Sequence, residues 1–113
     1  MKTKRTTFSS KAEETIQKIH SIDLSMIEMK LKSQKGGNWS ETKVKEGIKW
    51  YKRFLILNVK YPTKSIVPTA IIDEVWHTHI LDTRKYAEDC QTVFGYFVHH
   101  FPYFGLRSHE DAV

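Results

Sequence analysis

The 113-residue sequence contains one cysteine, three prolines and five glycines, and it has no long apolar run. A single cysteine cannot form a disulfide within the chain, which is typical of a reducing compartment. A membrane-spanning helix needs about 18 consecutive apolar residues, and no such stretch is present. The basic N-terminus is followed by polar residues 9–14, so no secretory signal is predicted. We therefore expect a cytoplasmic protein with no membrane partner.

The length of the chain favours a single domain, because 113 residues suffice for only one core of useful size. We expect residues 1–113 to form one helical domain. Residues 1–9 and 106–113 are predicted to be frayed at its ends.

The charge is unevenly distributed between the two halves of the chain. Residues 1–53 hold 13 Lys and Arg against 6 Asp and Glu, whereas residues 54–113 hold 5 against 7. Clustered basic residues raise the local potential and favour an acidic partner, either a protein or a nucleic acid. The alternative is a solvated helix surface, because the lysines alternate with glutamates rather than standing together.

Helical spacing of apolar residues and helix-capping residues predict an all-α bundle of about five helices. Ser10 and Glu13 form a capping-box pattern, which Ser25 and Glu28 repeat, and Ser40 is suited to cap a longer helix. Pro62 and the paired glycines at 36 and 37 interrupt the pattern. The expected helices span about residues 11–20, 25–32, 41–60, 69–81 and 82–94.

The last two predicted helices form a hairpin over about residues 69–94. Asp82 is suited to cap the second helix, and Gly95 lies where a left-handed C-terminal residue is expected. Residues 96–105 are too aromatic for a free tail, so we expect this C-terminal segment to cover the hairpin.

Residues that bind transition metals are concentrated between positions 73 and 100. Imidazole, thiolate and carboxylate groups together suit zinc and similar ions. The candidate metal ligands are Asp73, His77, His79, Cys90, His99 and His100.

Helix geometry limits which of these groups can meet. Asp73 and His77 are four residues apart and share a face, whereas His77 and His79 point in nearly opposite directions. We favour Asp73 and His77 with Cys90 and one of the adjacent histidines 99 and 100. His79 is either a further ligand across a π-bulge or a core histidine. Cys90 is either a ligand or a small buried residue.

The same region resembles the glycine-rich domain-containing-protein-like family over about residues 44–105. The residues that carry the resemblance are Asp73, Trp76, His77, His79, Tyr86 and Cys90. The longer plant members of that family carry a glycine-rich end, which is missing here, so the chain is similar to a compact, stand-alone bacterial form. The resemblance implies that these residues form one unit, and it implies no reaction.

Three functions follow from these observations as hypotheses. The first is a small metal-binding protein, most plausibly with zinc, whose site is structural or sensory. The second is a metal-free interaction module that binds an acidic protein or nucleic acid through its basic N-terminal half. The third, less favoured, is a hydrolase-type enzyme in which a histidine activates Cys90.

Overall fold

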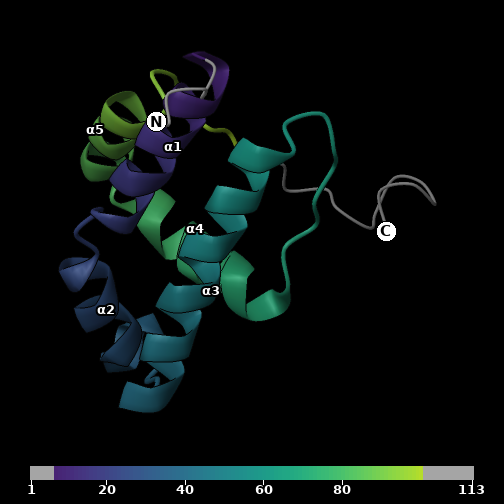
Figure 1. The fold of residues 1–113 in the computed structure, drawn as a ribbon. Coiled ribbons are helices and arrows are strands. Elements are labelled where there is room, and N and C mark those ends of the chain that lie inside the picture. The colour runs from purple at the N-terminus through teal and green to yellow at the C-terminus, as the bar shows by residue number, and fades with distance from the viewer. Residues whose placement is uncertain (1–6, 101–113) are drawn as a thin grey trace.

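Within residues 7–100, five α-helices follow one another and are joined by turns and loops (Figure 1). The computed structural model describes the backbone of residues 7–100 and the side chains of residues 11–100, and there is no strand within this range. The prediction of an all-α fold with five helices is confirmed. The elements are α1 (Thr7–His20), α2 (Ser25–Lys32), the short 3-10 helix η2 (Gln34–Gly36), α3 (Glu41–Lys60), α4 (Ala70–Leu81) and α5 (Thr83–Val93).

Side-chain caps fix the starts of α3, α4 and α5. The Ser40 hydroxyl accepts a hydrogen bond from the backbone N–H of Lys43 at 3.1 Å and begins α3. Thr69 caps α4 and Asp82 caps α5 in the same way. These caps satisfy backbone N–H groups that have no partner within the helix. Only α1 departs clearly from the expected bounds, since it begins at Thr7 rather than near residue 11.

Two glycines adopt the left-handed backbone that their positions require. Gly37 has φ of 119°, and a Cβ atom there would lie 2.8 Å from Nε1 of Trp39. Gly95 has φ of 84°, and its N–H donates to the carbonyl oxygens of Cys90 and Gln91 at the end of α5. Both positions confirm the breaks that the sequence predicts.

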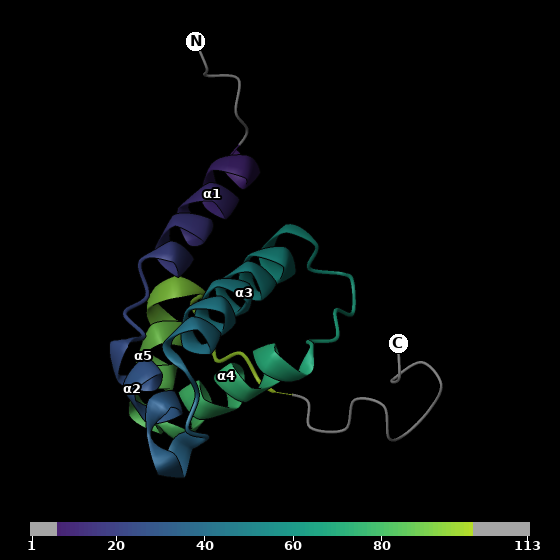
Figure 2. The same cartoon turned by 90° about the horizontal axis from the view of Figure 1, so that it is seen from below.

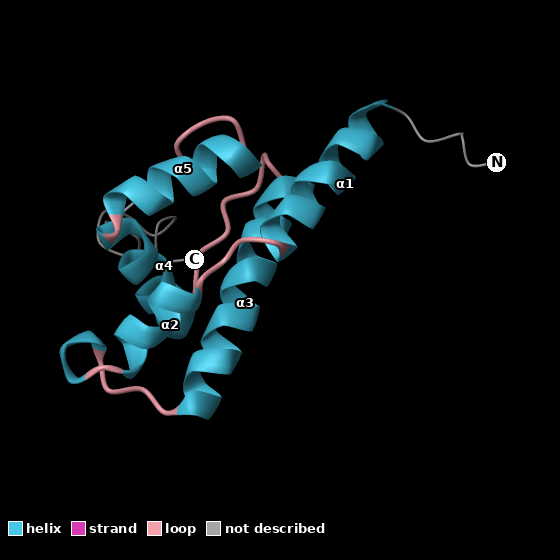
Figure 3. Ribbon diagram, turned by 90° about the vertical axis from the view of Figure 1, so that its left-hand side faces the viewer, coloured by secondary structure: helices cyan, strands magenta, loops and turns pink. Residues whose placement is uncertain are grey.

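Helix α3 is the central element of the bundle. It contacts α1, α2 and α4, and α4 in turn contacts α2 and α5. Figure 2 shows the first turns of α1 extending beyond the other helices, and Figure 3 shows α5, α4 and α2 together on one side of α3. The ammonium group of Lys52 ties α3 to the α1–α2 turn, because it donates to the carbonyl oxygens of His20 and Ile22 at 2.9 and 3.0 Å.

A single apolar core fills the space between the helices. Burying this surface is the main driving force for the fold. Its buried members come from every helix except η2: Ile19, Ile22, Leu24, Ile27, Leu31, Trp39, Val44, Tyr51, Phe54, Leu55, Ile72, Val75, Trp76, Tyr86, Cys90 and Val93.

The segment after α5 returns toward the hairpin. The backbone oxygen of Val98 accepts a hydrogen bond from the Tyr86 hydroxyl, and the Phe97 and Tyr86 rings meet edge to face with centroids 5.2 Å apart. Residues 101–105, which make up half of the predicted aromatic cover, lie outside the described residues. A complete cover over the hairpin therefore stays a prediction.

Candidate functional site

His79 is a histidine held inside the core by two hydrogen bonds. Its side chain is 2% exposed. Nδ1 lies 2.7 Å from the hydroxyl of Tyr51 on α3, and Nε2 lies 2.8 Å from Oδ2 of Asp89 on α5. The imidazole of α4 thereby links the two neighbouring helices. Lys85 completes the chain of contacts, because its Nζ lies 3.0 Å from the same Asp89 oxygen.

These contacts determine where the proton of His79 lies. An ionised carboxylate accepts hydrogen bonds and cannot donate one, so Nε2 of His79 carries the proton and donates it to Asp89. In the neutral ring Nδ1 is then an acceptor, and the Tyr51 hydroxyl donates to it. Both ring nitrogens of the neutral imidazole therefore have a hydrogen-bond partner.

Burial keeps both central groups uncharged. It lowers the pKa of His79, although the hydrogen bond and negative charge of Asp89 act in the opposite direction. It also raises the pKa of Tyr51 well above its ordinary value. At neutral pH the pair is therefore a neutral imidazole and a neutral phenol.

Trp76 and Tyr86 form a second hydrogen-bonded pair beside His79. The indole Nε1 donates to the Tyr86 hydroxyl at 2.9 Å, and that hydroxyl donates onward to the backbone oxygen of Val98. The rings of His79 and Tyr86 meet edge to face with centroids 4.8 Å apart. We call Tyr51, Trp76, His79, Tyr86 and Asp89 the buried polar cluster.

Asp73 and His100 form a separate pair at the start of α4. Nε2 of His100 is within hydrogen-bond distance of Oδ1 of Asp73, and the His100 ring lies 4.4 Å from the Trp76 ring, centroid to centroid. Asp73 therefore joins His100, whereas His77, its predicted partner, is exposed. His99 is exposed as well, which agrees with the expectation that only one of the adjacent histidines points inward.

The predicted metal-binding function is wrong. Among residues 7–100 no group of three or more His, Cys, Asp or Glu side chains is placed to hold a metal ion. The reason lies in the pairing, because the inward-facing donors are divided between His79 with Asp89 and His100 with Asp73. Zinc was predicted only as the ion for that site. The choice of ion is not tested by the structure and stays a prediction.

Cys90 lies in the core of the hairpin rather than at a reactive position. Its side chain is 2% exposed, it is in the body of α5, and it is a free thiol. Buried cysteines of this kind behave as small apolar residues, whereas reactive ones are partly exposed and lie beside positive charge. The placement gives no support to Cys90 as a nucleophile.

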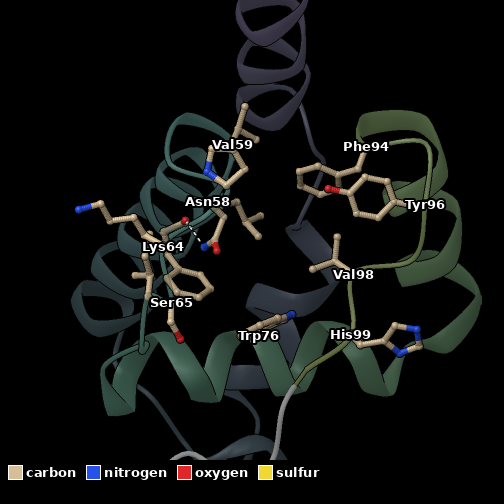
Figure 4. Close-up of a pocket in the computed structure, with 13 residues that line it drawn as sticks. Asn58, Val59, Lys64, Ser65, Trp76, Phe94, Tyr96, Val98 and His99 are labelled. Carbon is tan, nitrogen blue, oxygen red and sulfur yellow. Dashed lines mark hydrogen bonds between the residues drawn. The ribbon is translucent and has the colours of Figure 1, made fainter. Parts of the chain in front are cut away.

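A cavity of about 290 Å³ with a mixed polar and apolar lining lies beside Trp76, between the end of α3 and the segment after α5. Figure 4 shows Asn58 and Val59 on one side of this cavity and Phe94, Tyr96 and Val98 on the other. The Asn58 amide donates to the carbonyl oxygen of Phe54 at 2.8 Å, so it is bonded to the backbone of α3. Its lining also includes Lys64, Ser65 and His99, but among the described residues no hydrogen bond joins any two of these side chains, as a nucleophile and its base would require.

Sequence reasoning missed two members of the buried polar cluster. Neither Tyr51 nor Asp89 is among the candidate site residues that the sequence suggests. Asp89 had one local signal, since Lys85 and Asp89 are four residues apart and form an ion pair at 3.0 Å. The contact of Tyr51 with His79 spans 28 positions and has no local signature.

Comparison with known proteins gives a family and little else. The model of the UCP032817-like family matches residues 11–112. The chain belongs to the UCP032817-like family. The resemblance to the glycine-rich domain-containing-protein-like family is therefore wrong, and the UCP032817-like family, which is uncharacterised, supplies no reaction. No curated protein and no solved structure matches the chain.

The described helices also bear on the membrane question. Within residues 7–100, none of them combines the length and the apolar character that crossing a membrane requires.

Proposed function

We propose that this member of the UCP032817-like family is a binding module that docks an acidic partner through the basic outer surface of α3. The observation that carries the proposal is a charge asymmetry in the sequence around that helix. Residues 47–72 contain five Lys and Arg and no Asp or Glu. A basic surface of this kind raises the local concentration of anionic partners.

The contacts that the individual cations of α3 make support the proposal. Lys52 is used inside the fold at the α1–α2 turn, and Lys49 lies 3.7 Å from Glu46. Arg53 and Lys60 are exposed, and neither forms an ion pair with a carboxylate of the described residues. Their charges are therefore available to an anionic partner.

The buried polar cluster supports binding over catalysis. It has no buried side-chain nitrogen or oxygen without a hydrogen-bond partner, a statement that holds for all the described residues. A cluster whose buried polar atoms all have partners stabilises the core, whereas a catalytic site needs a group that is free to meet a substrate.

Salt dependence of binding tests the proposal. The full chain is titrated with two fluorescent probes, a short Glu-rich peptide and a short DNA duplex, over a range of salt concentrations. We expect affinity for at least one probe to fall steeply as salt rises. The peptide arm and the duplex arm distinguish an acidic protein from a nucleic acid.

A pair of double variants makes this test specific to α3. Arg53→Gln with Lys60→Gln removes two exposed cations from α3, and Lys11→Gln with Lys18→Gln removes two exposed cations from α1. The α3 variant should bind more weakly, and its salt slope with the duplex should be shallower by about one unit for each phosphate that no longer meets a cation. Binding that does not respond to salt, or an α1 variant that loses as much affinity, would contradict the proposal.

A further inference from the structure

The outer face of α3 carries apolar and basic side chains in alternation. Trp50, Arg53, Leu57 and Lys60 follow one another at intervals of three or four residues, so they share one face of the helix. All four are exposed, with Trp50 at 44% and Leu57 at 42%. We call these four residues the α3 stripe.

The α3 stripe borders a groove that is almost entirely apolar. The groove lies between the second half of α3, the end of the connection from α3 and the start of α4, and its volume is about 350 Å³. Figure 1 shows that connection looping away from the two helices it joins. We call this feature the α3–α4 groove, and its lining residues are Trp50, Arg53, Phe54, Ile56, Leu57, Lys60, Ile66, Val67, Thr69 and Ile72.

The charged side chains that line the α3–α4 groove are all of one sign. Its lining includes two cations, Arg53 and Lys60, and no carboxylate. The carboxylate nearest to the stripe in the sequence is Glu46, which accepts a hydrogen bond from Nε1 of Trp50 at 3.1 Å and lies 3.7 Å from Lys49. It is therefore already engaged on the protein itself.

An aromatic ring, and no carboxylate of the described residues, holds the guanidinium of Arg53 in place. It lies over the Trp50 ring, 4.8 Å from the centroid, and Nζ of Lys49 lies 5.5 Å from the same ring. Cation–π contacts hold these groups weakly at an exposed site, and they leave the N–H donors of Arg53 free to bind a carboxylate.

From this combination we propose that the α3–α4 groove binds an amphipathic segment of a partner protein whose apolar side chains enter the groove and whose Asp or Glu side chains meet Arg53 and Lys60. This inference rests on the proposed function, and it names the partner class and the site. Helical segments bind in grooves through apolar residues at three- and four-residue spacing. The α3 stripe offers the complementary spacing, with a cation after each apolar residue.

The lining of the groove favours a peptide over a nucleic acid. Single-stranded nucleic acids stack their bases on exposed aromatic rings. The groove has one exposed ring, that of Trp50, which could stack a single base at most, and Phe54 is buried at 4% exposure. The remaining apolar lining is aliphatic and suits Leu, Ile or Val side chains of a peptide.

Selection from a random peptide library displayed on phage tests this inference with the full chain as bait. The expected pool combines aliphatic residues at helical spacing with a net negative charge. The strongest peptide, made synthetically, is then titrated against the parent and against charge-neutral variants. Trp50→Gln with Leu57→Gln should lower its affinity at least about tenfold, because interface anchors of this size typically dominate binding.

A matched control comes from another exposed apolar pair on the same protein. Met26 and Leu81 are each 61% exposed and line a different cavity beside Asp82. Met26→Gln with Leu81→Gln should leave the affinity of the selected peptide unchanged. Leu57→Glu gives an independent check, since its carboxylate in the groove should repel the acidic peptide.

The outcomes separate this inference from the proposed function. The groove assignment would be overturned if the Trp50/Leu57 and Met26/Leu81 double variants lost equal affinity for the selected peptide. A selected pool without acidic residues would overturn it as well. If no peptide is enriched while the parent binds duplex DNA with a steep salt dependence, the groove is not a peptide site and the proposed function stands with a nucleic acid. If neither probe nor library gives binding, both ideas fail.

Discussion

The buried polar cluster and the α3 stripe involve different sides of the same helix and differ in how their polar groups are satisfied. Tyr51 faces inward and donates to His79, whose second nitrogen donates to Asp89. Two residues later, Arg53 faces outward and has no carboxylate partner among the described side chains.

That difference separates what stabilises the fold from what is free to bind. A buried polar group that loses its partner costs free energy, so the cluster is closed to other partners. Exposed cations and half-exposed apolar residues cost little in the free protein, and they can form new interactions when a partner arrives. Changes in the cluster should therefore affect stability, and changes in the stripe should affect binding.

The largest stability effect is expected for Trp76, which is 5% exposed and packs against Phe54 with ring centroids 5.1 Å apart. Trp76→Ala should lower the free energy of unfolding by about 3 to 5 kcal/mol, as measured by urea denaturation. Trp50→Ala is the matched control, and it should cost much less because Trp50 is 44% exposed. Equal losses for the two variants would mean that Trp76 does not anchor the core.

A smaller loss is expected when the Tyr51 hydroxyl is removed. Tyr51→Phe keeps the ring but leaves Nδ1 of His79 buried without a donor, which should cost about 1 to 3 kcal/mol. Tyr96→Phe removes the same atom from a ring that is 64% exposed and should be close to neutral. If Tyr51→Phe is as stable as the parent, the hydrogen bond between Tyr51 and His79 contributes nothing to the fold.

The helices and the buried polar cluster differ in how well the sequence alone predicts them. The starts of α3, α4 and α5 followed from capping residues, which are local signals, whereas the predicted Ser25 cap is absent because Ser25 lies inside α2 and the N-cap residue, Leu24, makes no side-chain hydrogen bond. The pairing of His79 with Tyr51 and Asp89 depends on how three helices cross, and no local pattern encodes that. The sequence thus left His79 open as a ligand or a core histidine, and the structure places it in the core.

The metal hypothesis failed for the same physical reason. Helical spacing predicted His77 beside Asp73, but His77 is exposed and the Asp73 carboxylate is paired with His100 alone. The α3 stripe has no signature in the sequence, because helical spacing of apolar residues indicates the buried face of a helix. Leu57 lies within an apolar run, and only the packing shows it to be 42% exposed.

A change in pH should have a smaller effect on stability, because the attraction of Asp89 partly offsets the burial of His79. The pKa of His79 is lowered by folding from its ordinary value of 6.5. Below that value the unfolded chain therefore binds more protons than the folded protein, and stability falls as pH decreases through this window.

The pH effect is measured as the free energy of unfolding at a series of pH values from neutral downward. His79→Gln should flatten this dependence, whereas His77→Gln, at an exposed position of the same helix, should retain it. A steep loss of stability that persists in the His79 variant would assign the pH dependence to other groups.

The smallest stability effect is expected on the α3 stripe. Arg53→Gln with Lys60→Gln removes no ion pair to a carboxylate of the described residues. Each substitution should change the free energy of unfolding by no more than about 0.5 kcal/mol. A larger loss would show that these cations stabilise the fold and are not simply available for binding.

The most direct test of the separation between the cluster and the stripe measures binding and unfolding on the same two proteins. Tyr51→Phe and the Arg53→Gln, Lys60→Gln double variant are each titrated with the Glu-rich peptide and the DNA duplex, under conditions where both are folded, and are then unfolded in urea. We predict that Tyr51→Phe loses stability and binds like the parent, while the double variant keeps its stability and loses affinity. The opposite pattern, or a loss of both properties in both proteins, would contradict the account.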